Sequence, residues 1–132
     1  MKPERVAKDD KPISIIPFSE VIPMNDAINE VLRKFPDEII ELYGQLRQMI
    51  LDSISPAPEE KLWAKMPSFY VGERFVRLIP FKDHINIEAT AILSHRGELT
   101  GYKITPKGML QLYTNQSLPV EVLKQIFAET LG

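Results

Sequence analysis

Residues 61–88, KLWAKMPSFYVGERFVRLIPFKDHINIE, predict two consecutive β-hairpins and decide the fold. Gly72 can take the positive φ that the first loop position of a type II′ turn requires. A two-residue loop at Gly72 and Glu73 therefore defines the first hairpin. A second loop at Lys82 and Asp83 defines the next one. The stretch thus predicts neighbouring antiparallel strands on either side of each loop.

The two loops determine which residues face one another across the strands. The predicted pairs are Val71 with Arg74, Tyr70 with Phe75, Phe69 with Val76 and Ser68 with Arg77 in the first hairpin, and Phe81 with His84, Ile79 with Asn86, Leu78 with Ile87 and Arg77 with Glu88 in the second. Directly paired residues point to the same face of an antiparallel sheet. The two registers, chosen separately, agree on the faces, and a one-residue slip would mix them.

One predicted face is almost purely apolar and the other is mixed. The apolar face collects Phe69, Val71, Val76, Leu78, Ile85 and Ile87. The mixed face collects Ser68, Tyr70, Phe75, Arg77, Ile79, Phe81, His84, Asn86 and Glu88. We expect helices to cover the apolar face and to leave the mixed face for water, a ligand or a partner. Pro80 removes a ladder donor, so we expect an edge position or a bulge there.

Length, cysteine content and charge limit the class of protein. The chain has 132 residues with 44% hydrophobic residues, which fits one domain. It has no Cys, which excludes a disulfide scaffold, a thiolate metal site and a Cys nucleophile. The formal net charge of −2 lacks the basic footprint of proteins that bind phosphate backbones, so we expect no nucleic-acid partner. No apolar run reaches the length of a membrane span, so we expect no membrane partner and a cytoplasmic setting.

The chain divides into a Pro-rich N-terminal arm, residues 1–23, and a single domain, residues 24–132. The arm carries Ile13, Ile15, Ile16, Phe18, Val21 and Ile22 between prolines. We expect it to lie extended on the core of the domain, or alternatively to dock on another subunit or partner. Hydrophobic spacing predicts helices over residues 25–34, 36–53 and 89–99, a strand over residues 109–113, and a last helix that opens at Pro119 with Ser117 as its N-cap.

Catalytic motifs are absent from the sequence. It contains no Gly-rich phosphate loop, no HExxH and no nucleophile elbow, so we expect a protein that is not an enzyme. Carboxylates do gather near the second predicted helix, at Asp37, Glu38 and Glu41. Glu38 and Glu41 are three residues apart and can share one side of a helix. Such oxygens can hold ferrous iron weakly, and a solvated acidic face is the alternative.

The mixed face is the second candidate site. Its aromatic and basic side chains can bind a small anionic ligand or a protein, and lysines in the flanking loops can collect at one end of the sheet to hold an anion. Ordinary exposed lysines explain the same pattern. Trp63 is either a residue at the edge of the core or a contact anchor. The candidate ligand or partner face consists of Trp63, Tyr70, Arg77, Lys82, His84, Lys103, Lys107 and Tyr113.

Four segments, KLWAKMPSFY, FKDHINI, GYKITPKGMLQL and LPVEVLKQIF, resemble in order and spacing the YdhG-like bacterial domain family. The likeness covers about residues 25–131, and MPSF and GYKITPKG are its most specific parts. The matching positions are Trp63, Met66, Pro67, Phe69, Lys82, His84, Gly101, Tyr102, Lys103, Lys107 and Gly108. The resemblance implies an α+β fold with N-terminal helices, a curved antiparallel sheet and a C-terminal helix. We expect about four to five strands, with the helices on one face.

Many members of that family have no assigned function, and some are described as frataxin-like iron chaperones. The resemblance therefore implies a non-enzymatic protein that binds iron weakly and transiently. The acidic cluster of Asp37, Glu38 and Glu41 would be the metal site, and an iron–sulfur scaffold protein or ferrochelatase would be the partner that receives the iron. The alternative is a binding module for a small anionic ligand or a protein partner on the mixed face. The sequence predicts no oligomeric state.

Overall fold

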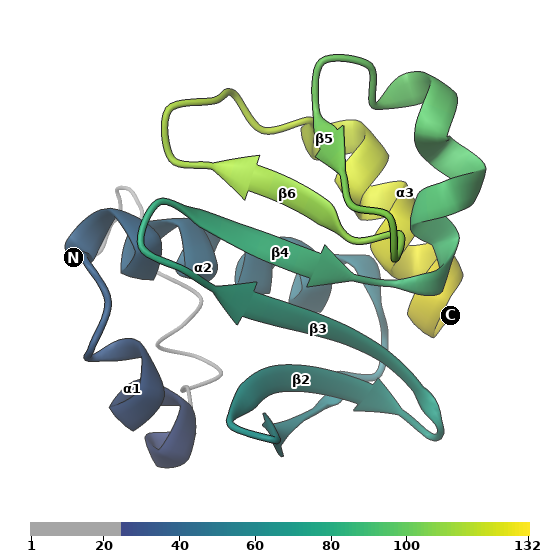
Figure 1. The fold of residues 1–132 in the computed structure, drawn as a ribbon. Coiled ribbons are helices and arrows are strands. Elements are labelled where there is room, and N and C mark those ends of the chain that lie inside the picture. Colours follow the sequence, from purple (N-terminus) through teal and green to yellow (C-terminus); the bar gives the residue numbers. More distant parts are fainter. Residues whose placement is uncertain (1–24) are drawn as a thin grey trace, which may run out of the picture.

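The computed structural model describes residues 25–132 (Figure 1). The predicted N-terminal arm, residues 1–23, lies outside the described residues, and the expectations about it stay predictions. In chain order the elements are α1 (Asp26–Leu32), α2 (Asp37–Ser53), β1 (Glu59–Trp63), β2 (Met66–Val71), β3 (Arg74–Pro80), β4 (His84–Glu88), the 3₁₀ helix η3 (Thr90–Glu98), β5 (Lys103–Ile104), β6 (Leu110–Tyr113) and α3 (Val120–Leu131).

The strands form one curled antiparallel sheet of six strands in the order β1-β2-β3-β4-β6-β5 (Figure 1). The predicted α+β class and curved antiparallel sheet are confirmed. The expected number of four to five strands was too low. The described sheet gains β5, a two-residue edge strand paired with β6 that no periodicity of side chains could reveal.

Both predicted hairpin registers are confirmed by the pairing of β2 with β3 and of β3 with β4. Gly72 has a φ of +63°, and Glu73 is not among the residues with positive φ, as a type II′ turn requires. In the second turn, the Phe81 N–H donates to the His84 carbonyl at 2.8 Å. The sequence therefore determines the centre of the sheet through two short loops.

Pro80 corrects one expectation, because it lies neither on an edge strand nor at a bulge. It is the last residue of β3, which has β2 and β4 on its two sides. The neighbouring Phe81 N–H points to β4, so the Pro80 nitrogen points toward the side of β2. Continuation of the β2–β3 register brings Pro80 opposite Lys65, which precedes β2. The missing donor therefore interrupts no ladder bond.

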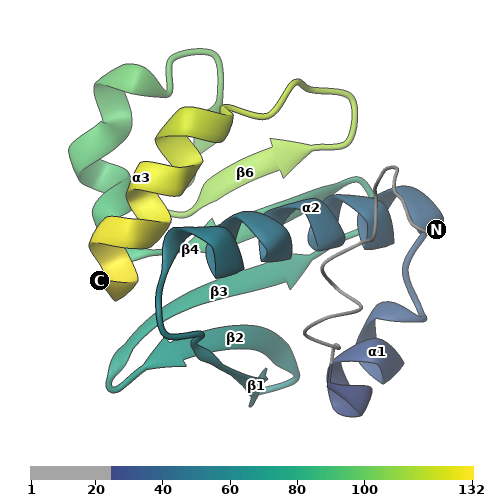
Figure 2. The same cartoon turned by 180° about the vertical axis from the view of Figure 1, so that it is seen from behind.

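Helices α2 and α3 pack on the predicted apolar face (Figure 2). Five of the six residues predicted for this face are fully buried, and Val71, at the end of β2, is half-buried. The helices supply the complementary apolar stripes at spacings of three and four residues. Fully buried helix residues include Ile39, Tyr43, Leu46, Ile50, Leu123, Ile126 and Phe127. Each large apolar side chain buried here contributes about 1.5–3 kcal/mol.

Helix α1 begins at a side-chain cap that also reaches the sheet. The Asn25 Oδ1 accepts hydrogen bonds from the N–H groups of Ala27 at 2.7 Å and Ile28 at 3.3 Å. The Asn25 Nδ2 donates to the Glu60 carbonyl of β1 at 3.3 Å. The last helix differs from the prediction, since its N-cap is Pro119 rather than Ser117.

A bidentate ion pair fastens α2 to the edge strand β1. The Arg47 Nε donates to Glu60 Oε2 at 2.9 Å, and Nη2 donates to Oε1 at 3.0 Å. Arg47 is only 1% exposed. The Tyr43 hydroxyl lies 3.5 Å from the same carboxylate, and burial together with this negative charge raises the pKa of Tyr43. Glu60 thus points to the helix side of the sheet, and both of its oxygens are used there.

A histidine links η3 to α3. The His95 ring lies between two carboxylates, with Nδ1 at 2.5 Å from Glu98 and Nε2 at 3.0 Å from Glu129. The ring is 9% exposed. Hydrogen bonds to Glu98 first and to Glu129 second raise the pKa of His95. The charged form of the ring therefore stabilises the contact between these two helices.

Candidate functional site

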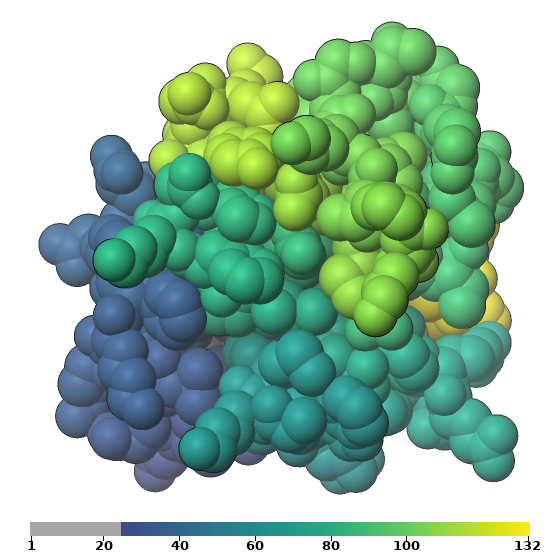
Figure 3. All heavy atoms as spheres, viewed as in Figure 1, coloured from purple at the N-terminus to yellow at the C-terminus, as the bar shows by residue number. Residues whose placement is uncertain are grey.

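The mixed face of the sheet is the side opposite α2 and α3, and no helix within residues 25–132 covers it (Figures 1 and 3). The pairing registers arrange its side chains in cross-strand rows. One row holds Lys61, Ser68, Arg77 and Glu88, and the next holds Trp63 and Met66 followed by Ile79, Asn86, Gln111 and Lys103. A further pair at the turn end is His84 with Tyr113.

Arg77, at the centre of the first row, is 5% exposed although it lies on this uncovered face. Its Nε donates to Ser68 Oγ at 2.9 Å, Nη1 to Glu88 Oε1 at 3.1 Å, and Nη2 to the Tyr70 hydroxyl at 3.2 Å. The small Ser68 side chain leaves room for the guanidinium to lie across the sheet. One carboxylate and two hydroxyl groups therefore compensate the buried charge, as such a charge requires.

Aromatic rings hold the two cations of this row in place. The Arg77 Cζ is 4.2 Å from the ring centroid of Trp63 and 4.0 Å from that of Phe75. The Lys61 Nζ is 4.9 Å from the ring centroid of Tyr70. These distances are typical of cation–π contacts. The protein's own cations thus already occupy aromatic faces that a cationic ligand would need.

Two hollows lie over these side chains and share Phe75 as a wall. The larger, of about 570 Å³, is lined by Lys61, Trp63, Tyr70, Gly72, Glu73, Phe75 and Arg77. The smaller, of about 270 Å³, is lined by Phe75, Glu88, Ala89, Thr90, Leu93, Lys107 and Gly108. Trp63 remains 52% exposed at the larger one. An apolar hollow with a few convergent polar groups is the usual form of a ligand site.

A separate aromatic stack occupies the turn end of the mixed face. The His84 ring stacks on Phe81 with centroids 4.6 Å apart, and it lies tilted by 30° against Tyr113 with centroids 4.7 Å apart. The His84 Nδ1 lies 2.8 Å from the Asp83 carboxylate. His84 and Tyr113, both predicted for the ligand face, therefore contact each other but belong to a different cluster from Arg77.

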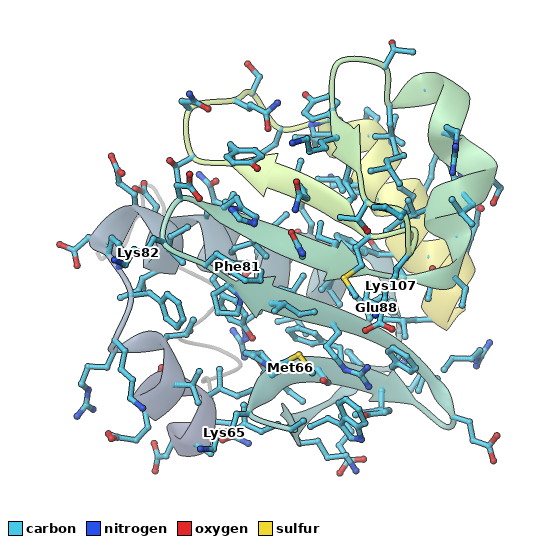
Figure 4. All side chains as sticks on the ribbon, in the orientation of Figure 1. Lys65, Met66, Phe81, Lys82, Glu88 and Lys107 are labelled. Carbon is cyan, nitrogen blue, oxygen red and sulfur yellow. The ribbon has the colours of Figure 1, made fainter. Side chains whose placement is uncertain are left out.

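The predicted lysines do not collect at one end of the sheet. Lys82 lies in the β3–β4 turn and Lys107 in the β5–β6 turn, and Figure 4 shows them at opposite ends of the sheet. The reason is the register of β4 with β6, which places the start of β6 beside the end of β4. Lys103 lies on the edge strand β5. Of the predicted face, only Trp63, Tyr70 and Arg77 form one cluster.

The acidic residues predicted to bind iron lie at the start of α2. Glu38 and Glu41 line a hollow of about 310 Å³ together with Gln45, Tyr113 and Gln116, whereas Asp37 does not line it. Within residues 25–132, no group of three or more His, Cys, Asp or Glu is placed to hold a metal ion. Iron binding at Asp37, Glu38 and Glu41 therefore stays a prediction.

Sequence reasoning placed Ser68, Phe75 and Glu88 on the mixed face but did not include them in the candidate site. The signal for two of them was present in the predicted register, because Ser68 and Glu88 are the direct partners of Arg77 on its two sides. The aromatic contact of Phe75 had no such signal, since it depends on how the guanidinium lies across the sheet.

Asn86 is the remaining unusual group of this face. It is 9% exposed, and its Oδ1 is the one buried side-chain oxygen or nitrogen of the described residues without a hydrogen-bond partner. Its Nδ2 points to the sulfur of Met109 at 3.9 Å, and a thioether is a weak acceptor. The central strand β4 thus carries an amide whose hydrogen-bonding capacity is largely unused.

No family model, curated protein or solved structure matches the chain. The resemblance to the YdhG-like family therefore rests on the quoted sequence segments and stays a prediction. Within residues 25–132, no helix has the length and apolar character needed to cross a membrane.

Proposed function

We propose that the protein is a non-enzymatic binding module that holds a small anionic ligand in the larger hollow of the mixed face. One observation carries the proposal. A guanidinium group is almost completely buried on a sheet face that no described helix covers, in contact with two aromatic rings and in the lining of that hollow. Burying this charge is costly, and the mixed face gains no packing against a helix in return.

The charges of the hollow favour an anion. Three N–H groups of Arg77 have partners in Ser68, Tyr70 and Glu88. A guanidinium has five N–H donors, so others remain for a ligand. Lys61 adds a second cation, with a side chain 51% exposed and only a distant contact to Glu59 at 3.6 Å. A cationic ligand is disfavoured because Arg77 and Lys61 already lie on the aromatic rings.

The aromatic walls favour a flat, unsaturated ligand body. Trp63 lines the hollow and is 52% exposed, and Tyr70 and Phe75 line the same space with ring centroids 5.9 Å apart. Rings fixed by cations and by each other are preorganised, which reduces the entropy lost on binding. The ligand class is therefore an organic acid with an aromatic or otherwise planar part.

The test is an NMR titration of the labelled protein with a set of small organic acids. We expect chemical-shift changes that concentrate on β1, β2 and β3 around Arg77. The Lys61→Met variant removes one cation from the hollow and should weaken binding roughly ten- to a hundredfold, the range expected when one hydrogen bond to a charged group is lost. Lys82→Met is the matched control, since Lys82 lies at the turn end of the sheet, and should leave affinity unchanged. Equal affinities of both variants and the wild type would contradict the proposal.

A second candidate function is the frataxin-like iron chaperone, which would deliver ferrous iron to an iron–sulfur scaffold protein or ferrochelatase. The observation that favours it is that Glu38 and Glu41 face one hollow beside Gln45. An anaerobic titration with ferrous iron should then broaden resonances at the start of α2, whereas magnesium should not. The Glu38→Gln, Glu41→Gln double variant should lose this response. An identical response to both metals would remove the reason for an iron-specific role.

A further inference from the structure

Asn86 has an environment that no contact within the described fold explains. It lies on the central strand β4, between Ile79 of β3 and Gln111 of β6. Among the described residues, its Oδ1 has no partner and its Nδ2 has only the Met109 sulfur. A buried polar group without a partner lowers stability, and most such groups in native proteins have a specific reason. Leucine would fill the same space with the same branching and without that cost.

Met109 lies against Asn86, with its sulfur 3.9 Å from the Asn86 Nδ2, and its side chain can move. The backbone of Met109 is fixed, since its N–H donates to Thr105 Oγ1 at 3.0 Å and its carbonyl accepts from the Thr105 N–H at 2.8 Å. The side chain is half-buried and unbranched, with three rotatable bonds. Rotation of this side chain uncovers the amide without any change in the strand. Met109 is thus suited to be a displaceable cover.

The register places Asn86 close to the proposed anion site. Arg77 pairs directly with Glu88, and Asn86 lies two residues before Glu88 on the same strand and the same face. Side chains in this diagonal relation are roughly 7–8 Å apart. Asn86 lines neither hollow, so a small ligand held at Arg77 can reach it with its other end only where the Met109 side chain moves aside.

We infer that Asn86 accepts a hydrogen bond from the bound ligand, and that the ligand is a small organic acid with a hydroxyl or amino group at the end remote from its acid group. This inference rests on the proposed function, because it requires the acid group to lie at Arg77 and Lys61. Asn86 would be a second point of attachment for the ligand, in addition to the two cations, and would therefore determine how the ligand is oriented. Met109 moves aside when the donor arrives.

The experiment compares two probes that differ in one hydroxyl group, 4-hydroxyphenylacetate and phenylacetate, by NMR titration of the full chain. The wild type should bind the hydroxylated acid about three- to tenfold more tightly, as one neutral hydrogen bond implies. Asn86→Leu should abolish that difference. Gln111→Leu is the matched control, because Gln111 is the neighbour of Asn86 in the same row and its Oε1 already accepts from the Tyr113 hydroxyl. It should keep the difference.

Two further measurements test the inference without a binding measurement on Asn86→Leu. Without ligand, Asn86→Leu should raise Tm by roughly 3–6 °C, because it removes an unsatisfied amide. A lower Tm would overturn the inference by showing that Asn86 stabilises the fold. Met109→Ala uncovers the amide and should increase the preference for the hydroxylated probe, and an unchanged preference would count against a displaceable cover.

The outcomes separate the inference from the proposed function. Equal binding of both probes to the wild type at the larger hollow would overturn the role of Asn86 and leave the anion site intact. A preference for the hydroxylated probe that persists in Asn86→Leu would do the same. Failure of both probes to shift any resonance of the mixed face would overturn the ligand class and with it the proposed function.

Discussion

The β1–β2 turn offers the sharpest test of the energetics of this fold. Ala64 has a φ of 50° and Lys65 a φ of 64°, so two non-glycine residues adopt the left-handed conformation in succession. Such a pair is typical of a type I′ turn, which strongly prefers Asn-Gly. The double substitution A64N/K65G keeps the turn and removes the steric conflict of the side chains. It should therefore stabilise the protein.

The magnitude follows from the two backbone conformations. A left-handed conformation costs an ordinary L-residue about 1–2 kcal/mol, so the pair costs roughly 2–4 kcal/mol. Asn still pays part of this cost, and Gly loses about 0.5–1 kcal/mol through the greater entropy of the unfolded chain. The net gain in the free energy of unfolding is then about 1–2 kcal/mol. For a domain of this size, Tm should rise by roughly 3–10 °C.

Urea unfolding followed by circular dichroism measures this gain, and a change in midpoint with an unchanged slope identifies it as a stability effect. The control is Glu73→Gly in the neighbouring turn, where φ is not positive and glycine should cost about 0.5–1 kcal/mol. If A64N/K65G is no more stable than the wild type while the control is less stable, the reasoning about turn strain is wrong.

Three other substitutions test the main polar contacts. Glu60→Gln removes the carboxylate charge that pairs with the buried Arg47 and should lower the free energy of unfolding by about 3–5 kcal/mol in urea, whereas Glu59→Gln, at an exposed position of the same strand, should change it by less than about 0.5 kcal/mol. The folded-state pKa of His95 is raised above its ordinary value of 6.5, so its contribution is fully present below that value and is lost as pH rises through the raised pKa. The stability difference between the wild type and His95→Gln should therefore be larger at pH 5.5 than at pH 8.5, and a pH-independent difference would refute the charged bridge. Arg77→Lys keeps the charge but loses the planar fork that reaches Ser68 and should cost about 1–3 kcal/mol by thermal unfolding, while equal stability would show that charge alone suffices.

The centre of the sheet could be predicted because its turns carry their own chemical signal. Gly72 marks one loop, and the alternation of side chains on both sides of it leaves a single register that separates the faces. The turn at Ala64 and Lys65 has no such signal, because neither residue is typical of positive φ. The pairing of β1 with β2 was therefore missing from the prediction, although Trp63 was correctly expected on the candidate ligand face.

The candidate site could be predicted only in outline for a related reason. The register correctly places Ser68 and Glu88 on the two sides of Arg77, yet the position of a guanidinium between Trp63 and Phe75 depends on side-chain rotamers and on β1. The predicted lysine cluster failed because loop membership says nothing about which end of the sheet a loop occupies. That property depends on long-range pairing, which periodicity does not encode.

The amide of Asn25 has a consequence for how the molecule meets its neighbours in a crowded solution. Strand β1 is an end of the sheet, and an open end with free carbonyl groups can recruit a strand from another chain. By donating to the Glu60 carbonyl, the residue that starts α1 blocks one of these groups. Asn25→Asp keeps an oxygen for the helix cap but loses this donor, so it should show the defect as time-dependent light scattering at high concentration.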